Sequence, residues 1–323
     1  ELAKQTTEKF GLNLDTLVVE VGSNDGTLLE SYRDKGVKAI GVDPTDITKL
    51  AIDKGLTTIT EWFNEDIAEK IKREYGKAKI ILATNTFAHV SSVDSITKGI
   101  EKLLTDDGVF ISENHYLLNL VQELQYDFIY HEHYRYYSIR SLSHLLNQFN
   151  LEIFDVERIP THGGSIRVFA GKKGNYDVMD SVGDLLKEEE NSGLNNFSTY
   201  QDFADRVTTH KRDFPKMLYD IREDGKTIMG LTGAARAITL LNSCNIGPEI
   251  LDAMTEISKS KIGKVSPGTH IKVIDQEVLF GDNQPDYGLL LSWHLADEIV
   301  PLFKQKGFNG KFIIPLPDPY IID

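Results

Sequence analysis

The sequence has a single cysteine, Cys244, among its 323 residues. One thiol cannot form a disulfide within the chain, and it cannot build a zinc site of the cysteine-cluster type. The near absence of cysteine also fits a reducing compartment. We therefore expect a cytoplasmic protein and no zinc in this chain.

Long hydrophobic runs are also missing. No apolar stretch approaches the roughly 20 residues that a membrane helix requires. The first residues, ELAKQTTEKFGL, have a helical pattern and no basic-then-apolar leader. We expect no membrane partner, and the abrupt helical start suggests a trimmed chain or a missing upstream segment.

Positive charge is scarce, because 35 lysine and arginine residues stand against 49 aspartate and glutamate residues. The resulting net charge of −14 repels phosphate backbones, which argues against nucleic acid as a general partner. An anionic ligand would therefore need locally placed cations or backbone amides.

Apolar runs alternate with amphipathic segments through the first half of the chain. This alternation predicts a parallel, doubly wound, Rossmann-like α/β sheet. Because 323 residues exceed one ordinary core, we expect this sheet domain at 1–176, then a helical bridge and a second, smaller α/β domain at 177–323. Strands are expected at 16–22, 38–44, 56–60, 78–87, 108–114, 151–159, 165–173, 269–274, 287–295 and 311–317, and the second domain opens with a strand–glycine–helix unit at 226–246.

The segment VVEVGSNDGTLLE joins the first predicted strand to a helix. In open parallel sheets, ligands bind at the carboxyl ends of the strands. Gly22 and Gly26 allow a tight turn there, and Asp43 ends the next strand, where it could accept hydrogen bonds from ribose hydroxyls. A turn that serves only strand–helix packing is the structural alternative.

Charge in this loop distinguishes two nucleotide cofactors. The dinucleotide fingerprint would require glycine where Asn24 and Thr27 stand. Glu20 and Asp25 would repel a pyrophosphate, whereas they would attract the sulfonium and ammonium groups of S-adenosylmethionine. The loop therefore favours S-adenosylmethionine over NAD.

Polar residues also end the fourth and fifth predicted strands. Asn85 and His89 would project near the same sheet edge as the glycine loop, and Glu113 follows the fifth strand. Each of them could contact a ligand. Equally, Asn85 could form a turn, His89 could be a packing residue, and Glu113 could belong to a loop.

The stretch DFIYHEHYRYYSIRSL, residues 127–142, concentrates tyrosine and histidine. His131 and His133 would point the same way on a strand and could bind a metal. Alternatively, one of them is a general base oriented by a carboxylate, or the tyrosines line a pocket and bind a polar ligand through their hydroxyls. The aromatic residues could also simply pack over a sheet edge, and the residues alone leave these interpretations open.

Several blocks of the sequence resemble the S-adenosylmethionine-dependent C-methyltransferases that act on nucleotide-linked keto-deoxysugars. The blocks are VVEVGSNDGTLL, ATNTFAHV, DFIYHEHYRYYS, THGGSIRVFAG, SKIGKVSPGTHIKV, PDYGLLLSWHLADEI and GKFIIPLP. They extend from the first glycine loop to the C-terminus, and Y-H-E-H is the most specific of them. The resemblance implies S-adenosylmethionine as methyl donor and a nucleotide-linked 4-keto-deoxysugar as substrate.

The resemblance also implies roles in the Y-H-E-H block. In the family's mechanism, a histidine that matches His133 removes a proton from the sugar, and residues that match Tyr130 and Glu132 lie in the active site. A ketone next to the deprotonated carbon would spread the charge as an enolate, and this carbon would then attack the methyl group. We expect His131 beside the substrate.

The chain departs from the family at its start, because these enzymes usually begin with a cysteine-rich zinc module. That module either lies upstream of residue 1 or is absent from this member. The sequence leaves open whether the protein is a monomer or a homodimer.

Two further clusters are candidates for contacts to the substrate. Gly233 and Arg236, in the second glycine loop, could hold a pyrophosphate. His162, Gly164 and Arg167 could contact a phosphate or a sugar. The structural alternatives are helix packing with a solvated arginine in the first cluster and a strand-entry turn in the second.

Two rival functions remain at this point. Oxygen methylation of a sugar or small molecule would also need a base, but no adjacent ketone. A donor-binding or nucleotide-binding protein without turnover would need neither.

Overall fold

The structure is a computed structural model that describes all residues from 1 to 323. Its contacts divide the chain into two compact units. The first unit comprises residues 1–117 and 132–192, and the second comprises residues 118–131 and 193–323. The expected boundary at residue 176 differs from this division in two places, since residues 177–192 belong to the first unit and residues 118–131 to the second.

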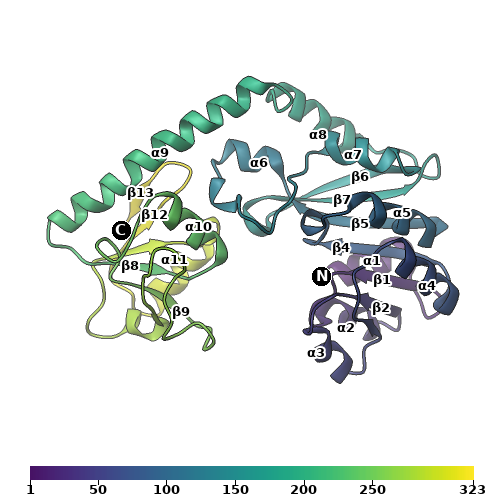
Figure 1. The fold of residues 1–323 in the computed structure, drawn as a ribbon, viewed down its shortest axis with the longest axis horizontal. Helices are drawn as coiled ribbons and strands as arrows, with labels where there is room; N and C mark the ends of the chain where they lie inside the picture. Colours follow the sequence, from purple (N-terminus) through teal and green to yellow (C-terminus); the bar gives the residue numbers. More distant parts are fainter. The chain divides into compact units, whose positions relative to one another are not determined.

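The first unit is built on a seven-stranded sheet in the order β3-β2-β1-β4-β5-β7-β6 (Figure 1). All neighbouring strands are parallel except β7, which runs antiparallel to both β5 and β6. The predicted α/β sheet is thus confirmed, with an antiparallel hairpin at one edge. The strands are β1 Leu17–Val21, β2 Lys38–Val42, β3 Thr58–Ile59, β4 Ala78–Thr84, β5 Leu104–His115, β6 Leu151–Ile159 and β7 Ser165–Lys172.

Helices connect the strands of this sheet and cover it. The apolar run of β1 is buried at every position, as expected for a central strand that is covered on both faces. The helices of the first unit are α1 Leu2–Phe10, α2 Thr27–Arg33, α3 Thr48–Asp53, α4 Glu65–Tyr75, α5 Val93–Leu103, α7 Ile139–Asn147 and α8 Asp180–Asn191, with short 3₁₀ helices η1 Phe87–His89 and η3 Thr161–Gly163.

The parallel strands of the first sheet bring several polar residues to one edge. Glu20 lies near the end of β1, Asp43 follows β2, and Asn85 follows β4. Glu113 is close to the end of β5, and the Asn85 backbone N–H donates to its carbonyl at 2.9 Å. This edge therefore gathers the polar residues that the sequence placed at strand ends.

The second unit contains a six-stranded sheet in the order β10-β9-β8-β11-β12-β13. Its strands are parallel apart from β13, which is antiparallel to β12. Leu124 and Tyr126 of the inserted segment belong to its hydrophobic core. The strands are β8 Ile228–Leu231, β9 Ala253–Glu256, β10 Val273–Asp275, β11 Tyr287–Leu290, β12 Lys311–Ile314 and β13 Tyr320–Ile322.

The helices of the second unit include one long element, α9, which appears in Figure 1 as a single continuous helix. The strand–glycine–helix unit expected at 226–246 is present, whereas β9, β13 and the helices at 117–122 and 296–305 were not predicted. The helices are α6 Leu117–Gln122, which starts at the unit boundary, α9 Phe197–Glu223, α10 Ala235–Ser243 and α11 Ala296–Gln305, with 3₁₀ helices η2 Tyr126–Phe128, η4 Gln276–Phe280 and η5 Trp293–Leu295.

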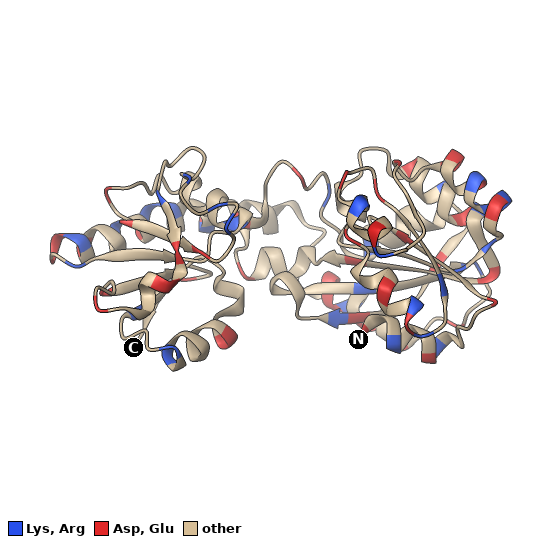
Figure 2. Ribbon diagram, turned by 90° about the horizontal axis from the view of Figure 1, so that it is seen from below, with Lys and Arg blue, Asp and Glu red and all other residues tan.

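Charged residues of both signs are spread over the two units. Figure 2 shows basic and acidic residues interspersed along the helices of both units. None of the helices is both long enough and apolar enough to cross a membrane.

A buried carboxylate ties helix α8 to the first unit. Glu189 is fully buried and accepts a hydrogen bond from the Tyr116 hydroxyl at 2.9 Å. It also accepts from the backbone N–H groups of Ile139 and Arg140, at 2.6 and 3.2 Å, in the first turn of α7. These donors explain why residues beyond 176 remain with the first unit.

Replacing Glu189 tests this link. The Glu189→Ala variant leaves buried donors without an acceptor, so we expect the free energy of unfolding to fall by about 3 kcal/mol. Glu189→Gln keeps an acceptor and should lose less. Urea unfolding followed by circular dichroism measures both, and Glu190→Ala, at an exposed position on α8, is the control. Equal losses at positions 189 and 190 would contradict the proposed link.

Candidate active site

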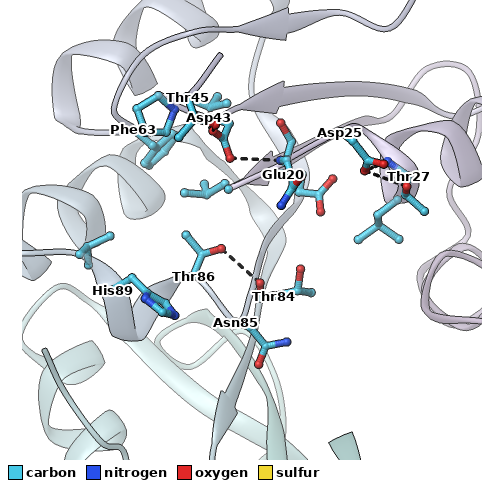
Figure 3. Close-up of a pocket in the computed structure, with 18 of the residues that line it drawn as sticks. Glu20, Asp25, Thr27, Asp43, Thr45, Phe63, Thr84, Asn85, Thr86 and His89 are labelled. Carbon is cyan, nitrogen blue, oxygen red and sulfur yellow. Dashed lines mark hydrogen bonds between the residues drawn. The ribbon is translucent and has the colours of Figure 1, made fainter. Parts of the chain in front are cut away.

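A cavity of about 820 Å³ opens at the polar edge of the first sheet. Figure 3 shows that side chains from the ends of β1, β2 and β4 surround it. Seven of the eight residues predicted to bind the cofactor line this cavity: Glu20, Gly22, Asn24, Asp25, Asp43, Asn85 and His89. Gly26 is the exception.

Two glycines shape the turn between β1 and α2. Gly22 has a φ of +77°, and a Cβ at this position would lie 2.2 Å from the Oγ1 of Thr86. Gly26 has a φ of +80°, and a Cβ there would meet Leu56 and Ala51. Both positions exclude side chains, so Gly22 lets two walls of the cavity approach each other, whereas Gly26 serves the packing of α2 against α3.

Glu20 carries a buried carboxyl group into the cavity. Its side chain has a relative exposure of 4 %, and its Oε2 atom has no hydrogen-bond partner. Burial, together with the nearby charges of Asp25 and Asp43, raises the pKa of Glu20 to about 8. A cation bound beside this group would relieve both the burial cost and the repulsion.

The other two carboxylates are anchored by the loops that carry them. Asp43 accepts hydrogen bonds from the backbone N–H of Asn24 at 3.1 Å and from the N–H and hydroxyl of Thr45 at 2.9 and 2.5 Å. Asp25 accepts from the N–H and hydroxyl of Thr27, and these bonds lower its pKa. Asp43 thus holds a fixed position at the tip of β2, and Asp25 helps to start α2.

His133 of the Y-H-E-H stretch lies beside one wall of the cavity. His89, in η1, lines the cavity, and the ring of His133 packs edge-on against it with the ring centroids 4.7 Å apart. His133 also contacts Tyr136, with the centroids 5.9 Å apart. The candidate base therefore lies beside a residue of the cavity wall.

Backbone and side-chain hydrogen bonds fix this approach. The N–H of Tyr134 donates to the carbonyl of Ala88 at 3.1 Å. The guanidinium of Arg135 donates to the carbonyls of Val90 and Ser91 at 2.5 and 3.1 Å. The segment that follows His133 is thereby held along η1.

The residues predicted to contact the substrate are placed differently. Glu113 and Arg167 face each other on β5 and β7, where the arginine Nε donates to Glu113 Oε1 at 2.7 Å. Arg167 also donates to Glu157 at 3.0 Å, so it is bound within a carboxylate network. His162 and Gly164 lie in and after η3, where the Gly164 carbonyl accepts from the backbone N–H at position 116.

Other predicted residues belong to the second unit. Tyr130 and His131 are in its inserted segment, whereas Glu132 and His133 belong to the first unit. Gly233 follows β8, and its carbonyl accepts a hydrogen bond from Lys261 at 3.1 Å.

Arg236 has a buried guanidinium that is paired with Asp127. This differs from the solvated or phosphate-binding arginine that the sequence suggested. The buried position opposite a carboxylate explains the difference, since the pair neutralises both charges.

Several cavity residues were not predicted from the sequence. They share positions in loops that follow strands: Ser23, Thr45, Trp62, Phe63 and Thr86. Trp62 is an exposed large aromatic residue, with a relative exposure of 69 %, and Phe63 beside it is buried. An aromatic pair directly after a short strand was a signal that could have identified this wall.

No group of three or more histidine, cysteine, aspartate or glutamate side chains is arranged to hold a metal ion.

Comparison with known proteins agrees with this geometry. Residues 1–156 match a family model described as a methyltransferase domain, and residues 160–317 match one described as a C-methyltransferase C-terminal domain. The C-methyltransferase NovU of Streptomyces niveus is 35% identical over 325 aligned residues, which cover 100% of this chain and 77% of that protein. The chain belongs to the C-methyltransferases. S-adenosylmethionine is the methyl donor of this C-methyltransferase.

Solved structures show a more distant likeness. One is the complex of the Haloferax volcanii Trm112 methyltransferase activator with a putative methyltransferase, at 14% identity and a TM-score of 0.42. Another is magnesium protoporphyrin IX methyltransferase of Synechocystis PCC 6803 with bound SAH, at 16% identity and a TM-score of 0.42. Each covers 53% of this chain, with 88% and 80% of the respective matched chains.

The cavity of this C-methyltransferase suits its methyl donor. The donor carries positively charged sulfonium and ammonium groups, and a cation bound beside the unpartnered Oε2 of Glu20 would lower the raised pKa of this carboxyl and favour its ionised form. Asp43 offers a carboxylate at a fixed position, and the side chains of Trp62 and Phe63 offer apolar surface. The residues present therefore fit the donor.

The Glu20→Gln variant tests the cost of burying this carboxyl. The pKa of Glu20 is raised from 4.5 to about 8, so its contribution to stability is full below about pH 4.5 and is lost as the pH rises towards 8. Glutamine does not titrate. In the donor-free protein, the melting temperature of the variant relative to wild type should therefore rise from pH 5 to pH 9.

Thermal unfolding at several pH values measures this difference. Glu8→Gln, at an exposed position on α1, is the matched control and should show no such trend. A difference for Glu20→Gln that stays constant with pH would contradict the raised pKa.

Proposed function

We propose that this C-methyltransferase transfers the methyl group to a carbon next to the ketone of a nucleotide-linked 4-keto-deoxysugar. The contact between the rings of His133 and His89 supports this proposal, because His89 lines the cavity proposed for the donor and His133 is the proposed base. A carbon acid needs such a base before it can act as a nucleophile.

The donor is assigned to the cavity of the first unit. Glu20 is proposed to attract its positive groups, and Asp43 to accept hydrogen bonds from its ribose hydroxyls. Asn85 and His89 complete the opposite wall. A donor held by these residues would supply an electrophilic methyl group at this edge of the sheet.

The chemical step is assigned to the Y-H-E-H stretch. His133 is half-buried and is proposed to take the proton from the sugar carbon, since imidazole exchanges protons near neutral pH. Tyr130 is proposed to donate a hydrogen bond to the developing enolate oxygen. Glu132, which is exposed, is proposed to bind a sugar hydroxyl or to orient a histidine.

Contacts to the rest of the substrate are proposed for residues outside the donor cavity. His131 and His162 are both exposed and could reach a polar ligand. Gly164, Gly233 and the Glu113–Arg167 pair were assigned to the same role from the sequence. Since this pair neutralises itself, its proposed part is to shape the sheet edge rather than to supply free charge.

The experiment that tests the function uses labelled donor and a panel of nucleoside-diphosphate 4-keto-6-deoxyhexoses. NMR of the product locates the label. A label on a carbon next to the ketone supports the proposal, whereas a label on oxygen supports the rival O-methylation. Exchange of the proton at that carbon in D2O, with S-adenosylhomocysteine in place of the donor, follows the base-catalysed step alone.

Replacing the base should uncouple chemistry from binding. The His133→Ala variant should lose turnover by roughly a hundredfold or more because no group removes the proton. Its affinity for S-adenosylmethionine, measured by calorimetry, should stay unchanged. His144→Ala, at an exposed position on α7, is the matched control. Unaltered turnover in His133→Ala would remove this histidine from the mechanism.

Removing the charge of Asp43 should weaken the binding of the methyl donor and leave the binding of the sugar nucleotide unchanged. Asp43→Asn keeps an oxygen acceptor for the loop but loses the charge-assisted bonds, so the affinity for S-adenosylmethionine should fall by about tenfold or more. Binding of the sugar nucleotide, titrated in the same way, should not change. An equal loss for both ligands would mean that the substitution disturbs the fold or that the donor lies elsewhere.

A further inference from the structure

Hydrogen bonds to a buried carboxylate hold the short helix η2 in the second unit. Asp127 is fully buried and receives two parallel hydrogen bonds from Arg236. The arginine Nε donates to Oδ2 at 3.0 Å, and Nη2 donates to Oδ1 at 3.0 Å. The indole N–H of Trp293 donates to the same Oδ2 atom at 2.9 Å. Three donors thus fix the orientation of this one carboxylate.

Aromatic rings enclose the cation of this pair. The centre of the Arg236 guanidinium lies 4.9 Å from the ring centroid of Phe128 and 5.2 Å from that of Trp293. A guanidinium is well suited to this place because it stacks on rings while it donates in a fork. The same arginine therefore contacts two consecutive residues. It donates hydrogen bonds to Asp127, and its guanidinium packs against the ring of Phe128.

Tyr126, the preceding residue, is held as well. Its hydroxyl lies 3.0 Å from His210 Nδ1 and 3.1 Å from the sulfur of Cys244. His210 Nε2 lies 2.6 Å from the carbonyl of Pro315 and donates to it. Burial lowers the pKa of His210, which favours the neutral ring that one donated and one accepted hydrogen bond require.

One ring contact connects these residues to Tyr130. Phe128 packs edge-on against Tyr130, with the ring centroids 5.9 Å apart. Residues 126–130 and their partners Arg236 and Trp293 all belong to the second unit, so this path lies within one compact body. It links a buried ion pair to the tyrosine that precedes the candidate base by three positions.

We propose that Asp127, Arg236 and Trp293 form a positioning clamp that fixes Tyr130 for the methyl transfer. The assignment rests on the proposed function, in which the Tyr130 hydroxyl stabilises the enolate. None of the three clamp residues needs to touch the substrate. Their part is to hold η2 and Phe128 rigid, so that the Tyr130 ring has one orientation.

The energetics of the pair agree with a positioning role. A buried ion pair contributes little net stability compared with well-packed apolar residues, but it demands one defined geometry. Misplacing a reacting group by an ångström can cost about a hundredfold in rate. A rigid clamp at this point in the chain would therefore raise the reaction rate, although the ion pair itself adds little to the free energy of unfolding.

Hydrogen exchange tests the clamp without any ligand. The main variant is Asp127→Asn, which keeps the shape of the side chain but turns one acceptor oxygen into a donor facing Arg236. A second, milder variant is Trp293→Phe, which keeps a ring and removes one hydrogen bond. We expect amide exchange in residues 128–133 to become about tenfold faster or more in Asp127→Asn, with a smaller increase in Trp293→Phe. Exchange in α7 should stay unchanged.

The matched control is Asp252→Asn, which breaks a partly exposed pair with Arg222 in the same unit. It should leave exchange in residues 128–133 unchanged. If exchange there is equally fast in wild type and in both clamp variants, the clamp is overturned, whatever the reaction proves to be.

A double-mutant cycle with Tyr130→Phe separates positioning from general stability. In the wild-type background, Trp293→Phe and Asp127→Asn should lower kcat, the latter by about tenfold or more, with S-adenosylmethionine affinity unchanged. In the Tyr130→Phe background, the same substitutions should cost less than about twofold, because the residue they position has lost its hydroxyl.

The cycle also distinguishes the clamp from the proposed function. Equal losses in both backgrounds would overturn the clamp and leave the assignment of Tyr130 intact. If Tyr130→Phe alone left kcat unchanged, the role of Tyr130 in the proposed function would be overturned, and the clamp as a device for catalysis would fall with it.

Discussion

The hydrogen bonds from Tyr134 and Arg135 to the carbonyls of Ala88, Val90 and Ser91 are the constraint on which the proposed active site depends. They hold the segment after His133 along η1, and η1 follows directly from β4. His133 and His89 meet as a result, although 44 positions separate them in the sequence. The proposed base therefore lies next to a residue that lines the cavity at this edge of the sheet.

Charge explains why this cavity suits a cationic donor. The whole chain is acidic, and the cavity concentrates this property in the carboxylates of Glu20, Asp25 and Asp43. Asp25 and Asp43 are stabilised by loop hydrogen bonds, whereas Glu20 is buried with a raised pKa. A pyrophosphate would increase this repulsion, and a sulfonium relieves it, so the same electrostatics that exclude one nucleotide cofactor favour the other.

Local patterns predicted most of the first unit. Strand periodicity and glycine positions indicated the order of elements, and seven of the eight residues predicted to bind the donor line one cavity. A single sequence does not show which residues far apart in the chain form ion pairs. Arg167 and Arg236 were therefore predicted to contact ligands, although each is bound to a carboxylate. The inserted segment 118–131 was likewise missed, because its buried partners lie more than 80 positions further along the chain. The roles of Tyr130, Glu132 and His133 depended on resemblance rather than on the pattern itself.

The chain crosses from one unit to the other three times, after residues 117, 131 and 192. No single cut can therefore divide the gene into two halves that each encode a whole unit. A fragment that starts at residue 193 would lack the inserted segment, which carries Asp127. Its Arg236 would then be a buried cation without a carboxylate partner. Recombination between related genes is constrained in the same way. A crossover between residues 132 and 192 would combine the inserted segment 118–131 of one parent with the second sheet of the other. Successful chimeras should inherit both parts of the second unit together.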